Sequence, residues 1–148
     1  MPQYMTEPDA DAYLTGNLLE HEAWECAEVP ERNLALIDAT RAIDNLNFRG
    51  CKADELQVNE FPRGEDTVVP LAIQQACALE AMSLLDGKST EDEIENLTAA
   101  NRGFSSVRTT YDRKQVQEWI ANGITSARAW QFIMSFLRDA EEIRISRV

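Results

Sequence analysis

Side chains of the types used in catalysis and metal binding are few in this sequence and stand apart from one another. The 148 residues include one histidine, His21, and three cysteines, Cys26, Cys51 and Cys77, with no CxxC pair. Tetrahedral zinc needs about four nitrogen or sulfur ligands, so no metal site is expected. We predict reduced, structural thiols. A surface or locally bonded imidazole is favoured for His21 over a general base, because no second histidine accompanies it.

Carboxylates offer two further candidates for chemistry. Glu80 lies in a strongly apolar segment, on the helical face of Ile73 and Cys77, so its carboxylate needs a cationic or hydrogen-bonding partner. A catalytic role competes with a structural ion pair. The absence of a second carboxylate or nucleophile favours the pair, and Arg41 is the predicted partner. The second candidate, the acidic run over 91–95, is typical of a solvated first helical turn, with a metal site as the alternative.

Motifs that mark nucleotide-binding or hydrolytic sites are absent from the sequence. It has no GxGxxG, no GxxxxGK followed by Ser or Thr, no HExxH and no GxSxG. We therefore predict a protein that is not an enzyme and that uses no cofactor. No stretch approaches the roughly 18 uninterrupted apolar residues of a membrane span, so no membrane association is expected.

The charge balance bears on nucleic acid. The 26 acidic and 14 basic side chains give a net charge of -12, which repels phosphate unless the cations gather on one face. The best candidate cluster surrounds Phe104 and Tyr111 and consists of Arg102, Arg108, Arg113 and Lys114. A DNA site is the weaker interpretation of this segment, and an interface or arm is favoured over it.

The elements that must position these residues are mostly helical. Apolar spacing and capping residues predict helices over 6–19, 30–46, 70–85, 90–100, near 116–121 and from 125 or 126 onward. Residues 47–69 have no sustained period and form a long ordered loop, anchored by Phe61, Pro62 and Arg63. The prediction is one domain, a small bundle of four to five helices with a long ordered loop and one or two extended, strand-like arms. Its helical core covers about 6–100, and an extended arm, a last helix and a terminal strand cover about 101–148.

Two segments alternate like strands, 104–111 and 142–148, and an exposed strand edge invites pairing with another chain. We predict an inter-subunit arm made by Phe104, Val107, Arg108 and Tyr111. The principal interface with a neighbouring subunit or larger ring is predicted to consist of Trp130, Phe132, Ile133, Phe136, Leu137, Ile143, Arg144, Ile145 and Val148.

Several short motifs follow one another over 4–87. They are the segment 4–13 with Asp9 to Tyr13, then Trp24, ALIDATRAID over 35–44, Phe48-Arg49-Gly50, Gln57 before Phe61-Pro62-Arg63, and Val69-Pro70 with Ile73, Ala76 and Glu80-Ala81. In this order they resemble the head-to-tail connector adaptors, or head completion proteins, of tailed bacteriophages. Phe61 stands where that family usually has tryptophan, and Asn59 where it has leucine.

The resemblance implies a structural virion protein located at the neck and assembled in the host bacterial cytoplasm. Its subunits would form a dodecameric ring that joins the portal protein to a tail or second connector protein. The ring would line the passage of double-stranded DNA without sequence-specific contacts. Some members of the family carry the label of DnaT-like, single-stranded-DNA-binding proteins. A replication accessory protein of that kind is therefore the alternative, which the net charge of -12 disfavours.

Overall fold

The computed structural model describes residues 3–103 and 116–139, with side chains for 3–96 and 116–139. This part contains seven α-helices: α1 (Glu7–Asn17), α2 (Glu22–Cys26), α3 (Val29–Asp44), α4 (Leu71–Leu85), α5 (Thr90–Gly103), α6 (Glu118–Ala121) and α7 (Ala127–Ile133), which continues into the 3-10 turn η1 (Met134–Phe136). No β-strand occurs in the described residues. The predicted mainly helical fold is confirmed.

Local sequence explains where the main helices begin and end. The Thr6 side chain accepts a hydrogen bond from the Asp9 amide at 3.4 Å, and Pro8 occupies the first turn of α1. Beyond the end of α4, Gly87 has a φ of +79°, which residues with a side chain rarely adopt. Gly123 has a φ of +87° between α6 and α7. The chain therefore reverses at positions that only glycine occupies without strain.

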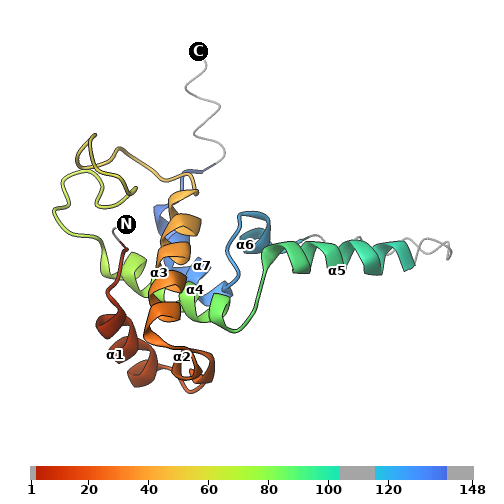
Figure 1. The fold of residues 1–148 in the computed structure, drawn as a ribbon. Helices are drawn as coiled ribbons and strands as arrows, with labels where there is room; N and C mark the ends of the chain where they lie inside the picture. The colour runs from red at the N-terminus through yellow and green to blue at the C-terminus, as the bar shows by residue number, and fades with distance from the viewer. Residues whose placement is uncertain (1–2, 104–115, 140–148) are drawn as a thin grey trace, which may run out of the picture.

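Helix α4 is the centre of the fold. It packs most extensively against α3 and α7 and also contacts α1 and α2 (Figure 1). Small side chains let these neighbours approach closely, because Ala76, Cys77, Ala78 and Ala81 are all fully buried. The helix predicted over 70–85 is therefore the central, buried element of the described structure.

One arginine ties the first three helices together. The Arg32 guanidinium donates to Glu7 at 3.0 Å and Asp11 at 3.2 Å, and also to the Trp24 carbonyl at 2.9 Å. It lies 5.2 Å from the centre of the Trp24 ring, whose indole N–H donates to Asp11 at 3.0 Å. Trp24 is fully buried in the short helix α2, which lies between the helices predicted over 6–19 and 30–46 and was not itself predicted.

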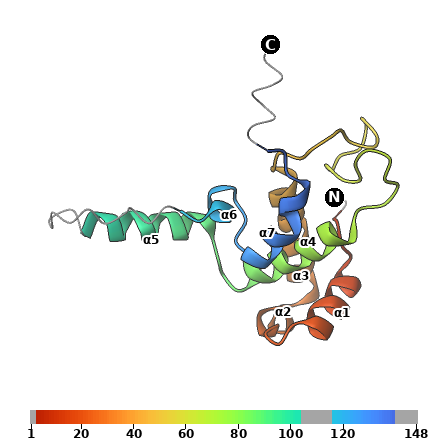
Figure 2. The same cartoon turned by 180° about the vertical axis from the view of Figure 1, so that it is seen from behind.

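Helix α5 extends away from the other helices as an arm. Both views show its far end remote from α1 to α4, and α6 lies beside its near end (Figures 1 and 2). Glu91 to Glu95 at its start are exposed, as expected of a solvated first turn. The arm is therefore held at its base, where α5, α6 and the start of α7 converge.

The long loop over 47–69 is packed onto the helical body by aromatic rings. Phe61 is buried, and its ring meets those of Tyr4, Phe48 and Phe136 edge to face, with centroids 5.9, 4.7 and 5.5 Å apart. The Arg63 guanidinium donates to the Arg49 and Gly50 carbonyls at 2.9 and 2.6 Å. The residues predicted as the loop anchor thus lie at the contact between the loop and the body.

The hydrogen-bonded pair of Tyr4 and Asp44 also holds the loop over 47–69 in place. The Tyr4 hydroxyl donates to the Asp44 carboxylate and accepts from the Phe61 amide, while the Glu60 amide donates to Asp44 at 3.1 Å. Burial raises the pKa of both Tyr4 and Asp44, and the hydrogen bond between them raises that of Tyr4 further. The loop is consequently ordered by both apolar and polar contacts.

Both strand predictions, over 104–111 and 142–148, fall outside the described residues. Within the described part, extended pairing is limited to two isolated bridges, between Phe48 and Leu137 and between Lys52 and Arg63. No helix in this part is long and apolar enough to cross a membrane.

Candidate nucleic-acid interface

Charge is unevenly distributed along the chain. Residues 1–96 carry 21 acidic and 6 basic side chains, whereas residues 97–148 carry 5 acidic and 8 basic ones. The net charge of -12 is therefore the sum of a strongly acidic first two thirds and a mildly basic last third. Any attraction for a polyanion is expected from the last third.

The basic side chains of the first 96 residues already have acidic partners. Arg32 pairs with Glu7 and Asp11, and the other ion pairs are Arg41–Asp38, Arg49–Asp139, Lys52–Glu60, Arg63–Glu60 and Lys88–Asp86. By contrast, Arg128 and Arg138 are exposed and have no acidic partner among the described residues. These two arginines are the cations of the described part that a phosphate can reach without displacing a carboxylate.

A groove of about 900 Å³ lies at the base of the α5 arm. Trp119 from α6, Arg128 from α7 and Lys88 from the α4–α5 connection line one part of it, and Trp119 is only partly buried. Four acidic residues also line it, Glu20, Glu22 and Glu25 of the α2 region and Asp86 after α4. A partly exposed indole can stack a base and an exposed cation can bind its phosphate, so Trp119 and Arg128 are the lining residues suited to a single strand.

Glu80 positions the start of α7 beneath this groove. Its fully buried carboxylate accepts hydrogen bonds from the Thr125 amide and hydroxyl, both at 2.9 Å, and from the Ser126 amide at 2.9 Å. Burial raises the pKa of Glu80, while these hydrogen bonds act in the opposite direction. Ser126 then caps α7 by accepting from the Ala129 amide at 3.2 Å.

The predicted Arg41–Glu80 ion pair is wrong. Arg41 lies on the outer side of α3 with 59% of its side chain exposed, and it pairs with Asp38 on its own helix at 3.2 Å. Glu80 satisfies its oxygens with backbone and hydroxyl donors of the α6–α7 connection. A buried carboxylate can be stabilised by N–H groups as well as by a cation, and the sequence shows only the cations.

Some of the residues predicted for the intersubunit interface are buried within the subunit, and others lie outside the described residues. Trp130 is 4% exposed and Ile133 is fully buried, both packed into the subunit's own core by α7. They are therefore not available to a partner, which corrects the prediction for these two positions. Phe132, Phe136 and Leu137 are partly buried against the same core. The other predicted interface residues, Ile143, Arg144, Ile145 and Val148, lie outside the described residues, as do the arm residues Phe104, Val107, Arg108 and Tyr111.

A comparison with protein families identifies the family to which this chain belongs. The model of the family described as "Putative DnaT-like ssDNA binding protein" matches residues 3–148. The chain belongs to this family. No curated protein and no solved structure matches it. Because the match spans the acidic body and the basic last third alike, this DnaT-like protein is one family unit over 146 of its 148 residues.

The predicted adaptor function is therefore wrong, and the alternative of a single-stranded-DNA-binding accessory protein is the one that the family match favours. The portal, tail and ring partners predicted with the adaptor have no support. The expected location at the virion neck stays a prediction. The signal that could have prevented the error was in the sequence: the net charge of -12 averages two regions of opposite sign.

Proposed function

We propose that this DnaT-like protein binds single-stranded DNA and serves as a replication accessory protein. The observation that carries the proposal is the family match over residues 3–148. The distribution of charge supports it, because the last 52 residues have a surplus of basic side chains, whereas the first 96 are strongly acidic. Binding without catalysis and without a cofactor is part of the proposal.

Within the described residues, Arg128 and Trp119 are the groups best placed to contact the strand. Phosphate neutralisation by exposed cations supplies the sequence-independent part of the affinity, and stacking on an aromatic ring supplies about 1–3 kcal/mol per base. Arg138 is a second exposed cation, located after η1. The predicted cluster of Arg102, Arg108, Arg113 and Lys114 rests on sequence alone and would extend this surface.

The direct test is a titration of a fluorescently labelled oligothymidine with the whole protein at several salt concentrations. Each phosphate contact to a single strand contributes about -0.7 to the slope of log affinity against log salt concentration. With about three to five contacts, we expect a slope between about -2 and -4 and a clear preference for the single strand over a duplex of the same length. The absence of salt-sensitive binding would reject the proposal.

Matched arginine variants locate the site. Arg128→Ala should weaken binding about 3- to 10-fold and make the salt slope about 0.7 less steep, because one phosphate contact is lost. Arg41→Ala removes the same charge from an exposed position on the acidic body and should change the affinity less than 2-fold. The sequence-based cluster is tested in the same way by Arg113→Ala combined with Lys114→Ala. Equal effects of Arg128→Ala and Arg41→Ala would place the strand elsewhere.

A further inference from the structure

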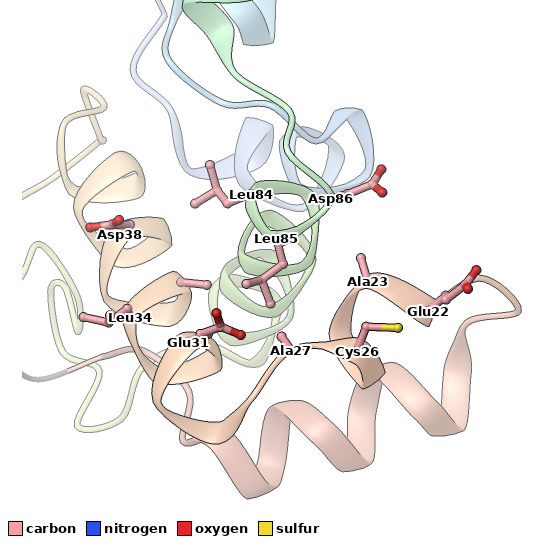
Figure 3. Close-up of a pocket in the computed structure, with 11 residues that line it drawn as sticks. Glu22, Ala23, Cys26, Ala27, Glu31, Leu34, Asp38, Leu84, Leu85 and Asp86 are labelled. Atoms are coloured by element: carbon pink, nitrogen blue, oxygen red, sulfur yellow. The ribbon is translucent and has the colours of Figure 1, made fainter.

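A second groove, of about 710 Å³, lies on the acidic body between α2, α3 and the end of α4 (Figure 3). Its apolar lining comes from all three helices, with Ala23 and Ala27 of the α2 region, Leu34 of α3, and Leu84 and Leu85 of α4. Leu34 is 62% exposed, and Val29 at the start of the same helix is 53% exposed. Two aliphatic side chains of α3 thus remain open to water in the described part of the structure.

The rim of this groove is acidic. Four of its lining residues are acidic, Glu22, Glu31, Asp38 and Asp86, and none is basic. Asp38 and Asp86 also form exposed ion pairs with Arg41 and Lys88, which do not line this groove. Figure 3 shows Glu31 and Leu85 pointing toward one another across the space between α3 and α4. Four carboxylates with only two neighbouring cations leave a surplus of negative charge, which repels phosphate and attracts cations. The groove is therefore unsuited to nucleic acid and complementary to a basic partner.

We propose that this groove docks a basic amphipathic helix of a partner protein. Binding sites commonly enclose about 300–1,000 Å³. Grooves between helices typically receive the apolar face of an incoming helix through residues spaced i, i+3, i+4 and i+7. Aliphatic side chains on such a face would cover Leu34, Leu84 and Leu85. Lysine or arginine side chains on its flanks would reach the carboxylates of the rim. This groove adjoins the one proposed for the single strand, because Glu22, Ala23 and Asp86 line both, but Leu34, Asp38 and Cys26 line this groove alone. Substitutions and labelling at these three positions therefore test the inference separately from the proposed DNA binding.

Two exposed cysteines provide an internal control for the test. Cys26 lines the groove, while Cys51 lies in the long loop, and both are exposed. The probe is a synthetic peptide of about 15 residues with leucines on one helical face and lysines elsewhere. Bound peptide should slow the alkylation of Cys26 at least 5-fold and change that of Cys51 less than 2-fold, as followed by mass spectrometry. A scrambled peptide of identical composition, with leucines on all sides, controls for attraction by net charge alone.

Variants of exposed residues separate the apolar and electrostatic parts of the proposal. Leu34→Ser should weaken peptide binding at least 5-fold, whereas Leu56→Ser, at a 91% exposed position in the long loop, should change it less than 1.5-fold. Asp38→Lys should weaken binding several-fold, compared with Glu65→Lys, which makes the same charge change at an exposed loop position. Circular dichroism of each variant verifies that the helices are intact.

Three results would overturn the proposal. The first is equal binding of the ordered and the scrambled peptide, which would reduce the interaction to net charge. The second is equal protection of Cys26 and Cys51. The third is protection of Cys26 that rises with protein concentration in the absence of peptide, which would assign the groove to a second copy of the chain. Oligonucleotide binding is measured separately, so failure of either activity can be recognised without the other.

Discussion

Replacing Glu80 by alanine tests whether a buried carboxylate holds the base of the α5 arm to the body. The substitution deprives three donors of their acceptor: the amides of Thr125 and Ser126 and the Thr125 hydroxyl. The hydroxyl has a second partner, Ser83 Oγ, at 2.8 Å, so the two amides determine the cost. Each buried donor left unsatisfied costs about 1–3 kcal/mol, and the desolvation of the carboxylate, which no longer occurs, offsets part of the sum.

We expect a net loss of about 2–4 kcal/mol in the free energy of unfolding at pH 7, or about 10 °C in Tm for a chain of this size. Urea unfolding followed by tryptophan fluorescence measures it, with an unchanged dependence on urea concentration showing that the folded state is still compact. Glu95→Ala, at an exposed position in α5, is the matched control and should cost less than about 0.5 kcal/mol.

Double-mutant cycles then identify the partner of Glu80. Thr125→Val combined with Glu80→Ala should show a coupling energy above about 1 kcal/mol, because the two side chains share a hydrogen bond of 2.9 Å. Arg41→Ala combined with Glu80→Ala should show almost none. A loss below about 1 kcal/mol for Glu80→Ala, or substantial coupling to Arg41, would refute the geometry on which the estimate rests.

Two further predictions follow from pKa shifts. Burial raises the folded-state pKa of Glu80 above its unfolded value of about 4.3. The part of its stabilisation that depends on protonation is therefore fully present below that pH and is lost as the pH rises through the folded pKa. The stability of the wild type relative to Glu80→Gln should therefore decrease from pH 4 toward pH 7, and an increase over this range would contradict the direction of the shift. Burial also raises the pKa of the Cys77 thiol to about 11, so at pH 8 an alkylating reagent should label only Cys26 and Cys51 in the native protein and all three cysteines in urea. Rapid native labelling of Cys77 would show that α4 opens at its centre.

The main helices could be predicted from the sequence because their signals are local. Thr6 and Pro8 mark the start of α1, and the run of alanine and leucine between Pro70 and Gly87 accounts for α4. Helix α2 was not predicted because it lacks such local signals. Its five residues are too few to show a helical period, and no side chain caps its first turn. Its formation depends on burial of Trp24 and on Arg32, which is a tertiary effect.

The partner of Glu80 and the two grooves could not be predicted, because each depends on segments that are distant in the sequence. Thr125 lies 45 residues beyond Glu80, and the interaction is made largely by backbone amides, which every residue has. The burial of Trp130 and Ile133 likewise depends on the packing of α7 against α4. An apolar face on a late helix indicates that it packs against something, without distinguishing its own core from a partner.

The net charge of the whole chain is a poor guide to nucleic-acid binding here, because the acidic and basic side chains are unevenly distributed along the sequence. Electrostatic interactions between exposed groups are screened over about 8 Å at physiological ionic strength. A phosphate near Arg128 on α7 therefore responds mainly to nearby charges, and much less to carboxylates on the far side of α3. Within that range, what matters is whether a cation already has an acidic partner, and the described structure separates the paired Arg32 from the unpaired Arg128. A protein with a net charge of -12 can consequently present an unpaired cation to a polyanion and, in an adjoining groove, carboxylates to a basic helix.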